Sequence, residues 1–121
     1  DMDRLMEMTG AEILDWPYKT DCCGGSLAIS RPDLVVKLSG KLISMAREAG
    51  AEALVVGCPM CHANLDTRQK EISQQFGEES NMPIFYFTEL LGLAMGYPGA
   101  KRWFRKHIVN PLSLLARKNF L

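Results

Sequence analysis

The sequence predicts an α/β fold with a mainly parallel sheet of about three strands and flanking helices. Short apolar runs without polar alternation recur along the chain, as expected of strands that a parallel sheet buries on both faces. Longer segments between them carry apolar residues at helical spacing. Strand and helix therefore alternate, and 121 residues suit a single domain.

The first half of the chain is predicted to contain a short helix, a strand and a long helix. Residues 3–9 favour a helix that ends at Gly10, and the apolar stretch 11–16 favours a strand closed by Pro17. Ser30 is the expected N-cap of the long helix, which Gly50 ends. Its expected apolar stripe is Leu34, Leu38, Leu42, Met45, Ala46 and Ala49, opposite the charged residues Lys37, Lys41, Arg47 and Glu48.

The second half repeats the alternation. Residues 51–57 and 83–87 are predicted strands, the helix after the first runs from Pro59 to about Phe76, and residues 77–81 form a polar loop. A helix over 88–95 ends at Gly96, and a short last helix begins near Pro111. The inward stripe of the helix that begins at Pro59 is expected to be Cys61, Leu65, Ile72 and Phe76, opposite Asp66, Lys70, Glu71 and Gln74.

Composition narrows the classes of partner. Hydrophobic residues make up 47% and charged residues 23%, and the formal net charge is zero, which argues against binding to nucleic acid or to an anionic membrane surface. The basic and aromatic stretch 101–106 is expected to be a solvated helix face or a subunit contact. No apolar run approaches the length needed for membrane insertion, and residues 1–4 lack a signal-peptide pattern. A cytoplasmic location is therefore expected.

All four cysteines lie in two clusters. Cys22 and Cys23 are followed by Gly24-Gly25, and Cys58-Pro59-Met60-Cys61 has C-x-x-C spacing. Such spacing suits zinc, an iron–sulfur cluster, thioredoxin-like redox chemistry or a pair of disulfides. Successive side chains on an extended backbone point apart, so the adjacent pair favours a centre with more than one metal atom.

The predicted topology brings the two clusters together. Ligands of open α/β sheets bind beyond the carboxyl ends of the strands, and each cysteine cluster follows a predicted strand. Cys61 lies at a helix N-terminus, where the backbone dipole is expected to favour its thiolate. His62, beside it, is a possible further ligand but is more readily a surface group or a neighbour of the ligands, and the sequence shows no partner for His107.

These motifs resemble the CCG domain of the heterodisulfide reductase B subunit, in a family that includes subunits of sulfur-oxidising complexes. The resemblance rests on Cys22-Cys23-Gly24-Gly25 and Cys58-Pro59-Met60-Cys61, and extends through 83–96 to 110–115. It implies that residues 1–121 are one CCG domain, the C-terminal part of the second such domain of a subunit. In this reading the N-terminal part, with a further upstream cysteine, precedes Asp1.

The resemblance also implies a function. Cys22, Cys23, Cys58 and Cys61 would hold a non-cubane [4Fe-4S] cluster that cleaves or forms a small-molecule disulfide. The expected partners are an iron–sulfur subunit and a flavoprotein subunit of the same complex. One alternative is a CCG-domain electron-transfer subunit of a glycolate, lactate or fumarate oxidoreductase. Another is a zinc-stabilised interaction domain that docks through its apolar C-terminal residues Trp103, Phe104, Ile108, Val109, Leu112 and Leu115.

Overall fold

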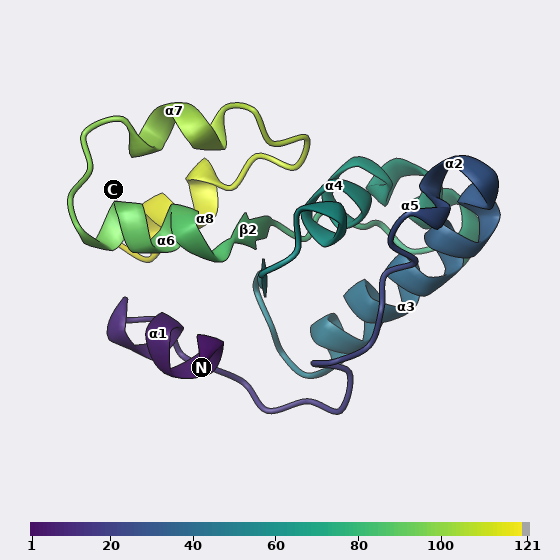
Figure 1. The fold of residues 1–121 in the computed structure, drawn as a ribbon, viewed down its shortest axis with the longest axis horizontal. Coiled ribbons are helices and arrows are strands. Elements are labelled where there is room, and N and C mark those ends of the chain that lie inside the picture. The colour runs from purple at the N-terminus through teal and green to yellow at the C-terminus, as the bar shows by residue number, and fades with distance from the viewer. Residues whose placement is uncertain (120–121) are drawn as a thin grey trace.

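The computed structural model describes residues 1–119, in which a small sheet lies between two groups of helices (Figure 1). The strands are β1 (Leu54–Val56) and β2 (Ile84–Tyr86). The helices are α1 (Met2–Met8), α2 (Leu27–Ser30), α3 (Pro32–Glu48), α4 (Pro59–Thr67), α5 (Gln69–Phe76), α6 (Phe87–Ala94), α7 (Ala100–Phe104) and α8 (Leu112–Arg117).

The sheet divides the molecule into two hydrophobic cores. β1 and β2 pair in parallel, with Leu54 opposite Ile84 and Val55 opposite Phe85. Leu54 and Ile84 pack into one core with residues of α3, α4 and α5, whereas Val55 and Phe85 pack into the other with α1, α6, α7 and α8. The alternation of side chains along each strand thus supplies both cores.

The strand predicted over residues 11–16 is wrong. No strand forms in residues 11–16. Among residues 1–119 the sheet consists of β1 and β2. Glu12 and Asp15 are exposed, so charged side chains interrupt the apolar run and do not suit a strand buried on both faces. Lys19 instead lies 2.8 Å from Asp3 and 3.9 Å from Asp15, which ties the segment to α1.

The long helix begins later than predicted and buries a different face. Ser30 ends α2 instead of capping α3, because Arg31 occupies the N-cap position ahead of Pro32. The predicted stripe is wrong in part: Ala49 is exposed, and Leu34, Leu38 and Met45 are only half-buried. The buried residues are Val35, Val36, Ser39, Gly40, Leu42, Ile43 and Ala46, the face that meets α4 and α5.

The helix predicted over 59–76 is two helices, α4 and α5, that meet at Arg68. The break turns Asp66 inward, contrary to the prediction, and also buries Gln69. Phe76 is 40% exposed although it was predicted to face the core, and its ring lies over Gly40 of α3. The predicted exposure of Lys70, Glu71 and Gln74 is confirmed.

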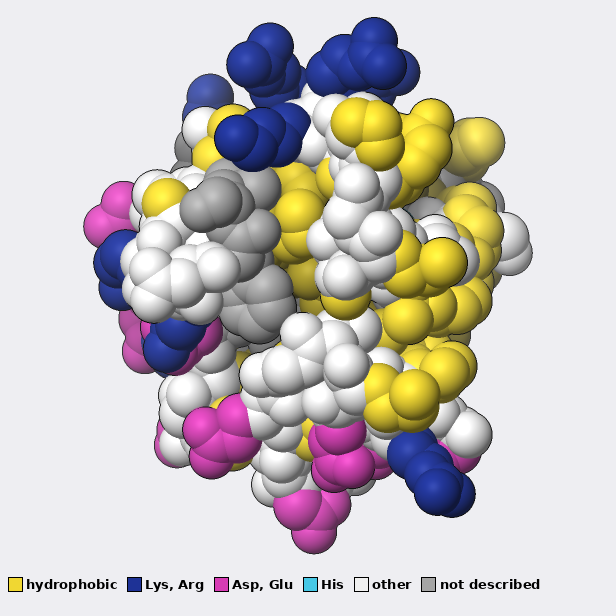
Figure 2. Space-filling model, turned by 90° about the vertical axis from the view of Figure 1, so that its left-hand side faces the viewer, with side chains coloured by type: hydrophobic (Ala, Val, Ile, Leu, Met, Phe, Trp, Pro, Cys, Tyr) yellow, Lys and Arg dark blue, Asp and Glu magenta, His cyan; other side chains and the backbone are white. Residues whose placement is uncertain are grey.

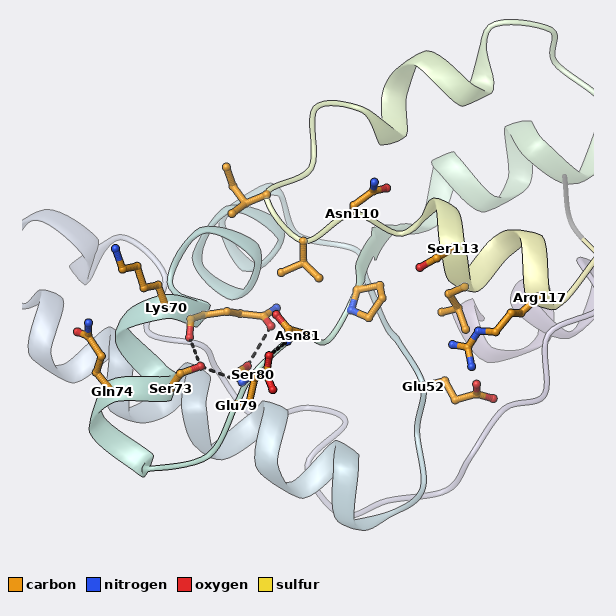
Figure 3. Close-up of a pocket in the computed structure, with 15 residues that line it drawn as sticks. Glu52, Lys70, Ser73, Gln74, Glu79, Ser80, Asn81, Asn110, Ser113 and Arg117 are labelled. Carbon is orange, nitrogen blue, oxygen red and sulfur yellow. Dashed lines mark hydrogen bonds between the residues drawn. The ribbon is translucent and has the colours of Figure 1, made fainter.

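Gln69 fixes the start of β2. Its Nε2 donates to the carbonyls of Leu65 and Met82, and its Oε1 accepts from the Ser80 hydroxyl and the Met82 N–H. Gln69, Ser80 and Asn81 are among the residues that line an open hollow between α5, the loop before β2 and α8 (Figure 3). The cysteines are not among its lining residues, and Gln69 already satisfies its hydrogen bonds within the protein.

Hydrophobic side chains gather on the flank shown in Figure 2. Exposed large hydrophobic residues of α1 and of the segment after α6 include Met8 at 79%, Met95 at 84% and Tyr97 at 54% exposure. Apolar patches of this kind mark contact surfaces with other proteins more often than free surface. Phe104 and Leu115, which the sequence assigned to a docking face, are instead buried in the second core. Across residues 1–119, no helix is long and apolar enough to cross a bilayer.

Candidate metal centre

The two cysteine clusters meet in the folded chain. The Cys23 thiol donates to the Cys61 sulfur with the two Sγ atoms 3.2 Å apart, although 38 residues separate them in sequence. Cys23 is fully buried, Cys61 is half-buried, and Cys22 and Cys58 are exposed. The predicted meeting of the clusters is therefore confirmed for Cys23 and Cys61.

A tight turn presents the first pair. Gly24 and Gly25 have φ angles of +109° and +52°, which favour glycine. Gly24 packs against α3 so closely that a Cβ would lie 2.8 Å from Cγ2 of Val35. The Gly24 N–H faces the Cys22 sulfur and the Gly25 N–H faces the Cys23 sulfur, each at 3.4 Å. The opposite burial of Cys22 and Cys23 agrees with the prediction that adjacent side chains point apart.

The second pair lies where β1 leads into α4. Cys58 is the extended residue before Pro59, and the backbone N–H groups of Cys61 and Met60 lower the pKa of its thiol. Burial, together with the neighbouring Cys23 and Cys58 thiols, raises the pKa of Cys61 to about 12. The predicted stabilisation of the Cys61 thiolate is thus wrong, because the free N–H groups at the start of α4 face Cys58 instead.

The donor set fits a thiolate-bound metal. All four cysteines are free, and the 3.2 Å between Cys23 and Cys61 exceeds the ~2.05 Å of a disulfide bond. Sulfur atoms that share one tetrahedral metal, each bonded at ~2.3 Å, lie roughly 3.7 Å apart. A small movement of the Cys23 and Cys61 sulfur atoms away from each other would therefore let both bind one metal atom. Soft thiolate ligands select zinc or iron–sulfur clusters.

An open groove leads to the second pair. It has a volume of about 980 Å³ and runs between the N-terminal segment and β1, with Trp16, Val56, Cys58 and Cys61 among its lining residues. Beside it, the Tyr86 hydroxyl donates to the Gly57 carbonyl at 3.3 Å and joins the ends of the two strands. Small molecules can therefore approach two of the four sulfur atoms.

His62 of α4, Glu89 of α6 and His107 form a partly buried cluster. His107 Nε2 donates to Glu89 at 2.8 Å, and His62 Nε2 donates to the Ile84 carbonyl at 3.2 Å and lies 3.8 Å from Glu89. Ligand atoms of the three side chains come within 4.8 Å of one another. Through these contacts the cluster links α4, α6 and residue 107.

Sequence reasoning missed Glu89 as the partner of His107, since nothing in the pattern joins positions so far apart. It also missed Asp66, whose carboxylate accepts from the N–H groups of Ile108 and Val109 at 2.8 and 3.0 Å. Asn64 could have been found: it lies three residues after Cys61 and so on the same side of α4. These residues hold the helix that carries Cys61.

Comparison with known proteins identifies a domain family that matches this chain. A model of the CCG cysteine-rich domain matches residues 1–66, more than half of the chain. The matched region contains both cysteine clusters. The resemblance predicted from the motifs is therefore confirmed.

Several relatives match nearly the whole chain. The B subunit of a ferredoxin/F420H2-dependent CoB-CoM heterodisulfide reductase from Methanosarcina acetivorans is 28% identical over 95% of the chain, and the B subunit of the ferredoxin-dependent enzyme from Methanosarcina mazei is 29% identical over the same share. The membrane anchor subunit of 8-methylmenaquinol:fumarate reductase from Wolinella succinogenes is 21% identical over 93%. The chain covers 39% of the length of each of these relatives.

Proposed function

This chain belongs to the CCG family of cysteine-rich domains, and on that premise we propose that Cys22, Cys23, Cys58 and Cys61 ligate iron in an iron–sulfur centre. The observation that carries the proposal is the 3.2 Å approach of the Cys23 and Cys61 sulfur atoms from two distant clusters. Four free cysteines in two clusters supply the thiolate set that such centres use. By family resemblance the centre is a non-cubane [4Fe-4S] cluster, which would supply single-electron transfer when bound.

The reaction proposed is the reduction, or the reverse formation, of a small heterodisulfide. In the reducing direction two electrons and two protons are taken up, one S–S bond breaks and two thiols form. The likeness to the B subunits of two heterodisulfide reductases supports this substrate class. The groove that reaches Cys58 and Cys61 supplies room for the substrate, and Val56 and Trp16 add apolar surface to its lining.

We place the chain in a cytoplasmic complex. An iron–sulfur subunit and a flavoprotein subunit would deliver the electrons, since the relatives are named as subunits of reductases. The exposed apolar flank of Figure 2 supports contact with such subunits.

Anaerobic reconstitution of the chain with iron and sulfide tests the ligand proposal. We expect bound iron and sulfide with an iron–sulfur absorption band, lost in Cys61→Ser and Cys23→Ser. Ser39→Ala is the matched control, because it removes a bond to the same loop without removing a sulfur atom. Stoichiometric zinc without iron would instead establish the zinc-stabilised interaction domain.

A second candidate is an electron carrier that acts on no disulfide, as in glycolate, lactate or fumarate oxidoreductases. The likeness to a fumarate reductase subunit favours it. Incubating the reduced, reconstituted chain with a mixed disulfide and counting the released thiols separates the two candidates. Two thiols per S–S bond support the reductase, whereas oxidation by an electron acceptor with no thiol release supports the carrier.

A further inference from the structure

Asn64 is a buried polar residue beside the cysteines. Its side chain is 3% exposed and lies on α4, one turn after Cys61. The Nδ2 atom donates to the Gly25 carbonyl at 3.0 Å. A carbonyl oxygen can only accept, so this contact fixes the amide with its nitrogen toward the turn that carries Cys22 and Cys23.

The second N–H of this amide is available for the sulfur of Cys23. Nδ2 lies 3.6 Å from the Cys23 Sγ, within the range of a hydrogen bond to sulfur. The Gly25 N–H approaches the same sulfur at 3.4 Å. Because Cys23 is fully buried, water does not supply these bonds in place of the protein.

Hydrogen bonds to ligand sulfurs tune a metal centre. An N–H that faces a thiolate withdraws charge from sulfur and favours the more electron-rich, reduced state, so each such bond raises the reduction potential. The effect is strong in a buried, low-dielectric site.

We propose that Asn64 is a positioning residue that donates a hydrogen bond to the Cys23 ligand and thereby sets the reduction potential of the metal centre. This inference rests on the proposed function, because it needs a thiolate-bound metal at Cys23. The same side chain links α4, which carries Cys61, to the turn that carries Cys23. It therefore both holds the two clusters together and adjusts the charge on one ligand.

Ser39 provides a matched control. Its hydroxyl donates to the Cys23 carbonyl at 3.1 Å, so it also anchors the turn from a buried position, and no bond from it to a sulfur atom is present among the described residues. Removing either side chain loosens the same turn, but only the removal of Asn64 takes an N–H from sulfur. A residue with a merely structural role would behave like Ser39.

The test compares the reconstituted chain with Asn64→Ala, Asn64→Ser and Ser39→Ala in an anaerobic redox titration. We expect the midpoint potential to shift to more negative values in both Asn64 variants and to stay at the wild-type value in Ser39→Ala. Equal shifts in the Asn64 and Ser39 variants, or no shift in any, overturn the inference. So does a failure of both Asn64 variants to bind metal while Ser39→Ala binds it, since Asn64 would then serve assembly alone.

A cobalt measurement separates this inference from the proposed function. The same variants are loaded with Co²⁺, and the sulfur-to-cobalt charge-transfer band is recorded. We expect the band to move to lower energy in the Asn64 variants only, because sulfur is more electron-rich without the N–H. If the wild type binds cobalt but no iron, the iron proposal fails and the cobalt band alone decides the role of Asn64. If it binds neither, both fail.

Discussion

Glu89 and His107 form a partly buried hydrogen bond of 2.8 Å that joins the first turn of α6 to the loop after α7. Burial alone would lower the pKa of His107, but the hydrogen bond and charge of Glu89, with the charge of Asp66, outweigh it and raise that pKa above 6.5. Burial likewise opposes the charged form of Glu89. Bonds from His107 and the Tyr86 N–H outweigh this effect and lower the Glu89 pKa below 4.5. The pair is thus most stable when both members are charged.

The free energy of unfolding should therefore have a maximum in mildly acidic solution. The contribution of His107 is complete below its unfolded pKa of 6.5 and is lost as the pH rises through its higher folded value. The contribution of Glu89 is complete above 4.5 and is lost as the pH falls through its lower folded value. Urea unfolding at a series of pH values should show this maximum between 4.5 and 6.5.

Substituting Glu89 measures how much the Glu89–His107 pair contributes to the pH dependence of stability. Glu89→Gln keeps an amide oxygen for the Tyr86 N–H but removes the charge, so both limbs of the profile should flatten. Stability at the maximum should fall by roughly 1.5–3 kcal/mol, the worth of a hydrogen bond to a charged group. Glu12→Gln, at an exposed position, should leave the profile unchanged. A profile in Glu89→Gln as steep as that of the wild type contradicts this account.

Substituting Gly24 should disturb the turn that carries the first cysteines. Gly24→Ala places a Cβ within 2.8 Å of Val35 at a φ of +109°, so either the turn or α3 must move. We expect a loss of at least ~2 kcal/mol in unfolding free energy and weaker metal binding. Gly25→Ala is the control: its φ is also positive, but no atom lies within 4 Å, so the cost should stay near 1 kcal/mol. Equal costs for the two variants would exclude the contact with Val35 as the cause.

Cys58 and Cys61 should differ in reactivity in the metal-free chain. Thiolate is the species that reacts with iodoacetamide, and a pKa of about 12 leaves roughly one part in ten thousand of Cys61 ionised at pH 8. Cys58 is exposed and its pKa is lowered, so it should react at least ~100-fold faster. Peptide mapping by mass spectrometry after timed labelling measures both rates in one sample. Similar rates would contradict the assignment of the helix N–H groups to Cys58.

Asp66 should be important for stability although it touches no cysteine. Asp66→Asn leaves one of the N–H groups of Ile108 and Val109 facing an amide NH₂, which cannot accept. The expected loss is ~1–3 kcal/mol in chemical denaturation. Asp33→Asn breaks only an exposed pair with Arg31, so it should cost clearly less stability than Asp66→Asn. If the two variants lose the same stability, Asp66 does not anchor α4.

The sequence could predict where the helices lie along the chain better than which face of each helix is buried. Periodicity and the end signals Gly10, Gly50 and Gly96 located α1, α3 and α6, because those signals are local. The buried face of α3 depends on where α4 and α5 pack, so its stripe was displaced. Residues 11–16 form no strand, because Glu12 and Asp15 interrupt the apolar run and stay exposed. The meeting of Cys23 with Cys61 is confirmed, but the strand-end argument for it holds only for the second pair, because β1 precedes Cys58 and residues 1–21 before Cys22 contain no strand. The Cys61 pKa and the contacts of Asn64 and Asp66 depend on tertiary distances.

The three-residue pairing of β1 with β2 has a consequence for the cysteines that follow it. Odd and even positions of each strand serve different cores, with Leu54 and Ile84 on one side and Val55 and Phe85 on the other. If β1 shifted by one residue along β2, its side chains would move to the opposite faces of the sheet. The first residues of α4, which follow β1, would then turn by about half a turn as well. The position of Cys58 therefore depends on which face of the sheet each of these four apolar residues occupies.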